Sequence, residues 1–171
     1  MNLKKSSEKP ELIVILDDIR STHNVGSILR SCDGFGVNEV YACGYTPYPK
    51  LVHDTRLPHE QEKTHKAIAK TALGAEQTVT VHTGMSVSEA IMELKNKGFV
   101  VAALEQAPTS RLLPSFSCPH KLALLVGNEV SGISTTNLGA CDVILEIPMV
   151  GAKESFNVAV ATAIALYQLT N

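Results

Sequence analysis

Uninterrupted apolar runs that alternate with helical segments constrain the fold of this chain more than any other feature. Residues 12–16 read Leu-Ile-Val-Ile-Leu, without a polar side chain. A strand with one face in water would alternate apolar and polar residues, so this run predicts a strand that is buried on both faces. Pattern and composition predict five further strands, at residues 37–43, 78–82, 99–104, 122–126 and 143–147.

Helices are expected between these strands, and they set the fold class. Apolar residues at helical spacing predict a helix over residues 24–35. Ser86 and Glu89 have the spacing of a capping box, which predicts the start of another helix. Helices are also expected at residues 59–73 and at 155–169, the latter apolar almost all round and therefore predicted to be buried. The alternation predicts an α/β fold with a mainly parallel, six-stranded sheet flanked by helices.

Composition limits the class of protein. The 171 residues predict a single domain over residues 1–171, with residues 1–10 as a frayed tail. No apolar run reaches the roughly 18 residues of a membrane span, so we expect a cytoplasmic protein without a membrane partner. The four cysteines have no C-x-x-C spacing, which predicts reduced thiols and no zinc site. The net charge of −2 argues against nonspecific nucleic-acid coating, and no DNA partner is expected.

Two loops near the end of the chain stand out because each follows an apolar strand directly. Residues 124–132 read Leu-Leu-Val-Gly-Asn-Glu-Val-Ser-Gly, and residues 147–157 contain a second stretch rich in Gly, Ser and Asn. Glycine lets a backbone approach a flat ligand closely, so the pair favours a binding site. Taken alone, Gly127 is explained as a turn residue and Ile147 as a core residue. The dinucleotide fingerprint G-x-G-x-x-G is absent from the turn at residues 17–23.

Three ordered segments resemble the signature motifs of the SpoU (TrmH-type) family of SPOUT RNA 2′-O-ribose methyltransferases. They are residues 24–30 with Phe35 and Gly36, residues 125–129 with Ser131 and Gly132, and residues 147–149 with 155–158. The similarity extends over about residues 12–170. It implies a C-terminal trefoil knot, a homodimer with the active site at its interface, and methyl transfer from S-adenosylmethionine to a ribose 2′-hydroxyl of RNA without a metal.

The resemblance also implies which residues form the site. Apolar walls suit adenine and ribose, while free backbone groups at the loop starts can read the adenine edge. The residues expected to bind the cofactor are Leu104, Gly127, Asn128, Ile147, Met149, Ser155 and Phe156. The residues expected to be catalytic are Arg30, Asn24, Glu129, Ser155 and Asn157.

Arg30 occupies the position of the family's catalytic arginine, although an arginine on a helix is usually only a solvated charge or an ion-pair partner. A guanidinium keeps its proton above a pKa of about 12, so binding a phosphate and stabilising a developing alkoxide fit it better than proton removal. Glu129 is expected either to cap a helical segment or to hold Arg30. Ser155 is also explained as an N-cap, Asn24 as the N-cap of the Arg30 helix, and Asn157 is expected to make a functional hydrogen bond.

Basic residues in the N-terminal half are candidates for RNA contacts. Lys63, Lys66 and Lys70 share one face of a predicted helix, which fits a solvated face as well as an RNA-guiding one. His53, His59 and His65 are six residues apart, a spacing that does not place metal ligands on one helical turn. The RNA-binding candidates are Arg20, Lys50, Arg56, Lys63 and Lys66.

The expected function is therefore S-adenosylmethionine-dependent 2′-O-methylation of RNA, with tRNA preferred as the substrate. Two alternatives stay open at this point, namely the same reaction on rRNA and a non-catalytic RNA-binding dimer of the same fold. A small-molecule methyltransferase is disfavoured, because the motifs resemble those of RNA enzymes. The modified nucleotide, its base and the proton acceptor do not follow from the sequence.

Overall fold

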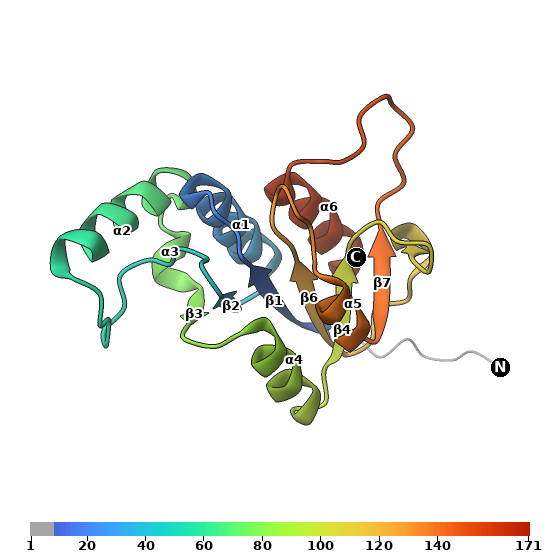
Figure 1. Ribbon diagram of the computed structural model, residues 1–171, viewed down its shortest axis with the longest axis horizontal. Coiled ribbons are helices and arrows are strands. Elements are labelled where there is room, and N and C mark those ends of the chain that lie inside the picture. The colour runs from blue at the N-terminus through green and yellow to red at the C-terminus, as the bar shows by residue number, and fades with distance from the viewer. Residues whose placement is uncertain (1–8) are drawn as a thin grey trace.

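The computed structural model describes residues 9–171, which form one parallel sheet between two layers of helices (Figure 1). The sheet order is β3-β2-β1-β6-β4-β7-β5, and every neighbouring pair runs parallel. The strands are β1 (Glu11–Asp17), β2 (Glu39–Cys43), β3 (Thr80–His82), β4 (Val100–Leu104), β5 (Arg111–Leu112), β6 (Lys121–Val126) and β7 (Val143–Glu146).

All six predicted strands are present, and the α/β prediction is confirmed, but the sheet has seven strands rather than six. The additional strand, β5, is a two-residue edge strand that pairs Arg111 with Leu145 and Leu112 with Glu146 of β7. Two residues carry no periodic pattern, so this strand leaves no signal in the sequence. The expectation of a frayed tail concerns mostly residues 1–8, which lie outside the described residues.

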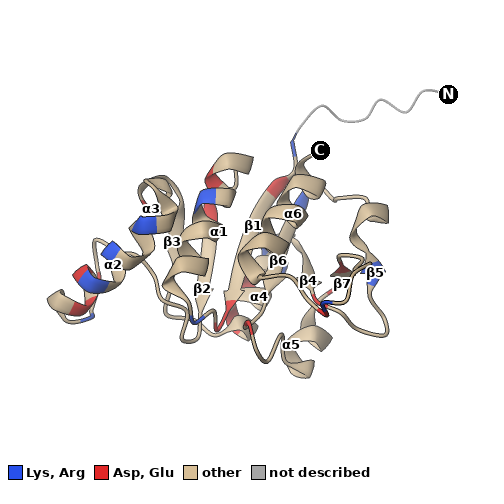
Figure 2. Ribbon diagram, turned by 90° about the horizontal axis from the view of Figure 1, so that it is seen from above, with Lys and Arg blue, Asp and Glu red and all other residues tan. Residues whose placement is uncertain are grey.

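Helices cover both faces of the sheet (Figure 2). The helices α1, α2, α3 and α6 lie over one face, while α4 and α5 lie over the other. None of the helices within residues 9–171 combines the length and the apolar composition needed to cross a membrane. Their bounds are α1 (Thr22–Phe35), α2 (Pro58–Ala72), α3 (Ala75–Thr78), α4 (Val87–Asn96), α5 (Thr135–Ala140) and α6 (Val158–Thr170), with a 3₁₀ turn, η1, at Leu113–Ser115.

The central strand β1 shows why the sheet needs helices on both sides. Leu12, Val14 and Leu16 belong to the hydrophobic core under α1 and α6. Ile13 and Ile15 point to the opposite core under α4. Successive side chains of a strand alternate between faces, so a continuous apolar run fills both cores.

Helix α6 differs from the expectation of full burial. Ala165, Leu166 and Leu169 are buried against the sheet, but Val160 and Tyr167 are 48% and 60% exposed. A helix that is apolar on every side is expected to be buried all round, but in a single chain only one side of α6 is covered. The opposite side of α6 therefore presents apolar side chains to solvent in a single copy of the chain.

The parallel arrangement places all of the carboxyl-terminal strand ends along one edge of the sheet. The loops after β4, β6 and β7 start side by side there, because these three strands are neighbours. The chain connections also change direction between β1 and β6, and crevices for ligands form at such points in open α/β sheets. The two glycine-containing loops of the sequence are thus brought together by the strand order.

Gly26 in the first motif is required by the packing of α1 against α2. A Cβ atom on Gly26 would lie 2.2 Å from Thr71 Oγ1 and 2.4 Å from the Ile68 carbonyl oxygen. Contacts this short do not occur for real Cβ atoms, and backbone cannot move away as a flexible side chain can. The packing of α1 against α2 therefore requires glycine at this position of the motif.

We predict that Gly26→Ala lowers the free energy of unfolding by about 1–3 kcal/mol, since overpacking forces the two helices apart. Gly34→Ala is the matched control, because no atom lies within 4 Å of its added Cβ on the same helix. The control is expected to be neutral or to stabilise by up to about 1 kcal/mol through helix propensity. Urea unfolding of both variants is the measurement, and equal effects would contradict this account of the α1–α2 contact.

Candidate active site

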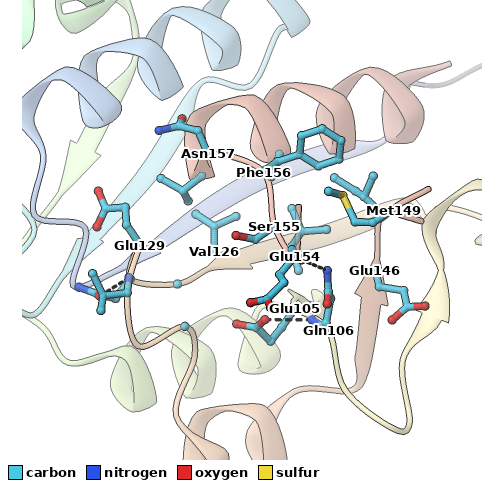
Figure 3. Close-up of a pocket in the computed structure, with 18 residues that line it drawn as sticks. Glu105, Gln106, Val126, Glu129, Glu146, Met149, Glu154, Ser155, Phe156 and Asn157 are labelled. Atoms are coloured by element: carbon cyan, nitrogen blue, oxygen red, sulfur yellow. Dashed lines mark hydrogen bonds between the residues drawn. The ribbon is translucent and has the colours of Figure 1, made fainter. Parts of the chain in front are cut away.

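A pocket of about 460 Å³ lies at the carboxyl ends of β4, β6 and β7 (Figure 3). This volume falls within the roughly 300–1,000 Å³ typical of small-molecule sites. All seven residues expected to bind a cofactor line it, namely Leu104, Gly127, Asn128, Ile147, Met149, Ser155 and Phe156. The three loops contribute apolar walls together with backbone groups, which is the composition expected of a site for a flat, partly polar ligand.

Gly127 marks a close approach of two backbone segments beneath the pocket. A Cβ atom there would lie 2.7 Å from the Gly132 carbonyl carbon and 2.8 Å from the Ile133 nitrogen. Its role is therefore more than that of a turn residue, because any side chain would separate the two ends of the loop that follows β6. The shape of the pocket wall depends on this glycine.

Asn128 fixes the same loop through its buried side chain. Its Oδ1 accepts hydrogen bonds from the Val130 and Ser131 nitrogens at 2.9 and 3.1 Å, and its Nδ2 donates to the Asp18 carbonyl oxygen at 2.7 Å. Asp18 has a left-handed backbone with φ of 52°, held also by the Tyr45 nitrogen, which donates to its carboxylate. Asn128 thus joins the loop after β6 to the turn after β1, and its side chain acts on the loop rather than on the cavity.

A chain of side-chain hydrogen bonds connects the three sequence motifs. Asn24 Nδ2 donates to Glu129 Oε1 at 2.7 Å, and Asn157 Nδ2 donates to Asn24 Oδ1 at 3.2 Å. Glu129 also accepts from the Arg20 nitrogen at 3.3 Å. Burial raises the pKa of Glu129, but the bonds from Asn24 and from nearby backbone N–H groups outweigh it, so the pKa is lowered. Glu129 and Asn157 line the pocket, and both are hydrogen-bonded to Asn24, which is not part of the lining.

Several local roles differ from those expected. Ser21, not Asn24, is the N-cap of α1, and it accepts from the Asn24 nitrogen at 3.2 Å. Asn157, not Ser155, is the N-cap of α6, where its Oδ1 accepts from the nitrogens of Ala159 and Val160. Asn157 therefore has a structural task in addition to its hydrogen bond to Asn24. In each case the helix begins at a different residue from the one that apolar spacing indicates, and the cap moves with it.

Arg30 does not reach the pocket of its own chain. Six residues separate it from Asn24, which corresponds to about 9 Å along the helix axis and about 240° around it. Its side chain is exposed, and it forms no hydrogen bond or ion pair with any residue in the described part of the chain. The alternative in which Glu129 holds Arg30 is wrong, because Glu129 binds Asn24 and the Arg20 nitrogen instead.

The structure adds pocket residues that the sequence motifs do not contain. Glu105 and Gln106 directly follow β4, Glu146 ends β7, and Glu154 lies between the two parts of the third motif. Gln106 Nε2 donates to the Glu154 carbonyl oxygen at 2.7 Å and so ties the long loop before α6 to the end of β4. A signal was available, because polar residues at the carboxyl ends of parallel strands are general candidates for ligand contacts.

A second cavity of about 350 Å³ adjoins the first and shares Asn128 and Gly132 with it. Arg20, an RNA-binding candidate, lines this cavity together with Asp17. Asp17 is 8% exposed, burial raises its pKa, and Asn137 donates a hydrogen bond to its carboxylate at 2.9 Å. Arg20 is exposed, and its backbone nitrogen donates a hydrogen bond to Glu129 of the main pocket.

The remaining RNA-binding candidates lie far from the pocket. Helix α2 lies at the end of the molecule opposite β7 (Figures 1 and 2), and its lysines are exposed. Lys66 pairs with Glu62 at 3.1 Å, whereas Lys50 and Lys63 are exposed. Arg56 has a different role, because its guanidinium bonds Asp54 and the carbonyl oxygens of residues 48 and 49 and lies over the Tyr48 ring. Its donors are used to close the proline-containing loop.

Neither an activated thiol nor a group of metal ligands is found among the cysteines and histidines of the described residues. Burial raises the pKa of Cys32 and Cys43 to about 12 and that of Cys118 and Cys141 to about 11, so none is an activated nucleophile. All four are free thiols. Within residues 9–171 no three His, Cys, Asp or Glu side chains are grouped as metal ligands would be.

Comparison with known proteins places this arrangement in a family. The profile of the SpoU rRNA methylase family matches residues 11–167, and the chain belongs to this family. The resemblance of the three motifs is thereby confirmed. The 23S rRNA (guanosine-2′-O-)-methyltransferase RlmB of Coxiella burnetii is 31% identical over 170 residues, which are 99% of this chain and 62% of that protein. The chain thus spans less than two thirds of this relative.

Solved structures share the fold. The TrmH/SpoU tRNA modifying enzyme of A. aeolicus superimposes with a TM-score of 0.77 and 26% identity, over 95% of this chain and 75% of that one. The SpoU methyltransferase AviRb of Streptomyces viridochromogenes, solved in complex with AdoMet, superimposes with a TM-score of 0.75 and 23% identity over 96% of this chain and 61% of that one. At 23% identity the AviRb likeness establishes the fold alone.

The double role of Asn157 generates a stability prediction. Asn157→Ala removes the cap of α6 and should lower the free energy of unfolding by about 1 kcal/mol. Asn157→Asp keeps the cap, because a carboxylate accepts the same N–H groups and complements the helix dipole, but it loses the donor to Asn24 Oδ1, so it should be destabilised less than Asn157→Ala. Chemical denaturation followed by circular dichroism distinguishes them, and an unchanged Asn157→Ala would show that the cap contributes nothing.

The Arg56–Asp54 contact generates a prediction about pH. The hydrogen bond from Arg56 lowers the pKa of Asp54 to about 2, and the Asp54 side chain is only 2% exposed. A lowered folded-state pKa stabilises the fold above the unfolded value of about 3.9, and this stabilisation disappears as the pH falls toward 2. Asp54→Asn should therefore cost on the order of 2 kcal/mol at pH 7.

The test compares urea unfolding of Asp54→Asn and the original chain at several values between pH 7 and pH 2.5. The difference in unfolding free energy should shrink as the pH is lowered below about 4. Glu60→Gln on the neighbouring helix is the control, because the Glu60 side chain is exposed and makes no hydrogen bond within the described residues. A difference for Asp54→Asn that is independent of pH would contradict the charged contact.

Proposed function

We propose that this chain is an S-adenosylmethionine-dependent RNA methyltransferase that methylates a ribose 2′-hydroxyl. The observation that carries the proposal is the pocket lined by the second and third family motifs, to which Asn24 of the first motif is joined by hydrogen bonds with Glu129 and Asn157. Membership of the SpoU rRNA methylase family supports it. Activity, substrate and partners are all part of the proposal.

The pocket fits the proposed methyl donor. Ile147, Leu104 and Val126 offer apolar walls for an adenine ring, and the Gly127 backbone can approach it because no Cβ intervenes. The AviRb structure, which contains AdoMet, has the same fold and supports this assignment. When bound, S-adenosylmethionine supplies an electrophilic methyl group on a sulfonium, and the proposed reaction uses no metal.

The chain's own residues would then provide alignment and charge. In the proposed reaction the ribose 2′-oxygen forms a bond to the methyl carbon and loses its proton, so holding the oxygen in line is the main catalytic task. Glu129 and Asn157 are fixed at the pocket by Asn24, which makes them positioning residues for the RNA. A guanidinium near the 2′-oxygen and its phosphate would stabilise negative charge without transferring a proton.

Arg30 can supply that guanidinium only from a second copy of the chain. It lies on a side of α1 different from that of Asn24, and it is exposed and unpaired among residues 9–171. The exposed apolar side of α6, on which Val160 and Tyr167 are nearly two turns apart, offers a surface for such a copy. We therefore propose a homodimer in which Arg30 of one protomer completes the pocket of its partner.

tRNA is the preferred substrate in this proposal, and rRNA is the alternative. The A. aeolicus enzyme is named for tRNA and the C. burnetii enzyme for 23S rRNA, so these relatives do not favour either. Lys50, Lys63 and Lys66 would contact RNA backbone away from the reacting nucleotide. A single catalytic domain, a trefoil knot formed by the C-terminal segment and a cytoplasmic location are further parts of the proposal; the four free thiols fit that location.

A non-catalytic RNA-binding dimer is the competing function. It would have no need for an open pocket of about 460 Å³ beside ordered polar side chains. The retention of Arg30, Ser155 and Asn157 in this chain also favours an enzyme. Binding of the methyl donor and methyl transfer separate the two functions.

We predict that Arg30→Ala lowers methyl transfer to RNA by at least about 100-fold, because the fixed charge at the reacting oxygen is lost. Affinity for S-adenosylmethionine should stay within about twofold, since the proposed contacts of Arg30 are with the RNA phosphate and the reacting oxygen rather than with the methyl donor. Arg111→Ala, which also removes an exposed arginine, is the control and should transfer normally. Calorimetry measures the affinity, and a labelled-methyl assay measures the transfer. Transfer at the wild-type rate by Arg30→Ala would show that Arg30 is not a catalytic residue.

Mixing variants tests the shared site. A Gly127→Val chain should lose the pocket, because its side chain would overlap the backbone of Gly132 and Ile133. Refolding it together with the Arg30→Ala chain would create mixed dimers with one intact pocket and one intact arginine. Activity should reappear only in the mixture. A mixture as inactive as its components, although mixed dimers form, would contradict a site shared between protomers.

A further inference from the structure

The lining of the main pocket carries charge of one sign. Glu105, Glu129, Glu146 and Glu154 all contribute to it, and the lining contains no Lys, Arg or His from the described part of the chain (Figure 3). The full sequence has 17 acidic and 15 basic residues, so overall composition does not explain this local excess. Four carboxylates gathered around a concave site create a negative potential that favours a cationic ligand.

The hydrogen-bond partners of these carboxylates are neutral. Glu105 accepts from the Ile133 nitrogen at 3.1 Å and from the Gln106 nitrogen at 2.9 Å. Glu146 accepts from the Ser110 hydroxyl. Neutral donors orient a carboxylate but leave its formal charge uncompensated, so each group still attracts a cation in the cavity.

Glu105 and Glu154 are the pair most directly presented to the interior. Gln106 connects them, because its backbone nitrogen donates to Glu105 Oε1 and its side chain donates to the Glu154 carbonyl oxygen at 2.7 Å. In Figure 3 both carboxylates point into the middle of the pocket, between Ser155 and Gln106. The Glu154 side chain makes no hydrogen bond within residues 9–171, which leaves it available to a ligand.

The proposed methyl donor changes charge in the reaction, and the inference rests on that proposed function. S-adenosylmethionine carries a sulfonium, an ammonium and a carboxylate, so its net charge is positive. On transfer the carbon–sulfur bond breaks with its electron pair on sulfur, the methyl carbon bonds to the ribose oxygen, and the hydroxyl proton leaves. The spent product, S-adenosylhomocysteine, keeps every other atom but has a neutral thioether and no net charge.

We propose that the glutamates of this pocket, Glu105 and Glu154 foremost, select the charged methyl donor over the neutral spent product. Methyl transfer then weakens the hold of the pocket on its own product, because the cation that the carboxylates attract has disappeared. The same charges repel RNA phosphates. The phosphate of the target nucleotide must therefore be met by basic side chains outside the pocket, such as Arg20 and the partner's Arg30.

Binding measurements test the proposal without requiring turnover. Isothermal titration at low salt would compare S-adenosylmethionine, S-adenosylhomocysteine and sinefungin, an analogue with an amine in place of the sulfonium. The original chain should bind S-adenosylhomocysteine at least about fivefold more weakly than the two cationic ligands. Raising the salt to about 1 M should weaken the cationic ligands and reduce this ratio, because surface-accessible charges are screened.

Two variants and a control identify the residues. Glu154→Gln should weaken the cationic ligands about threefold to tenfold while changing S-adenosylhomocysteine less than twofold. Glu105→Gln should have the same effect on the three affinities. Because the Glu105 carboxylate also accepts a hydrogen bond from the Ile133 nitrogen, Glu105→Gln could disturb the fold, and Glu154→Gln tests the proposal independently of that defect. Glu60→Gln on the distant helix α2 removes one negative charge elsewhere and should leave all three affinities unchanged.

Product binding as tight as donor binding in the original chain, or equal effects of the variants on all three ligands, would overturn the proposal while leaving the proposed function intact. Failure of all three ligands to bind the original chain would instead overturn the proposed function.

Discussion

The hydrogen bonds of Asn24 are the interaction on which the site depends. One amide group donates to Glu129 at 2.7 Å and accepts from Asn157 at 3.2 Å, so it joins segments 105 and 133 residues away along the chain. Asn157 in turn caps α6, which couples the start of that helix to the pocket. Three loops that would otherwise move independently are therefore held in one geometry, and polar networks of this kind rigidify when every member has a partner.

The parallel sheet makes this network possible, because it brings the starts of the loops together before any side chain acts. β4, β6 and β7 are neighbours, and their loops leave from one edge of the sheet. Gly127 then allows two backbone segments to approach within a distance that no side chain would permit. The resulting cavity has an acidic lining, and Arg30, Val160 and Tyr167 are not part of it. Among the described residues the lining contains no cation, and in the proposed homodimer Arg30 of the other protomer would supply one.

Much of the fold was predictable from residues with strong local signals. Continuous apolar runs such as residues 12–16 predict buried strands, and the Ser86–Glu89 capping box was found as expected. Features set by contacts distant in sequence were not predictable. A charge pattern cannot reveal that Arg56 binds Asp54 and two carbonyl oxygens, nor can helix periodicity decide that Asn157 rather than Ser155 caps α6. The seven residues expected to bind the cofactor came from motif resemblance. Glu105 carried a signal as a polar residue after a parallel strand, whereas the place of Glu154 in the pocket required the structure.

The most direct test of the account is transfer of a labelled methyl group from S-adenosylmethionine to total tRNA and, separately, to ribosomal RNA. Nuclease digestion and mass spectrometry would then identify the modified nucleotide. A 2′-O-methylated nucleotide in either pool is the predicted result, and its sequence context would define the substrate. A methyl group found on a base rather than on a ribose, or no transfer to either RNA by a chain that binds the donor, would contradict the central claim.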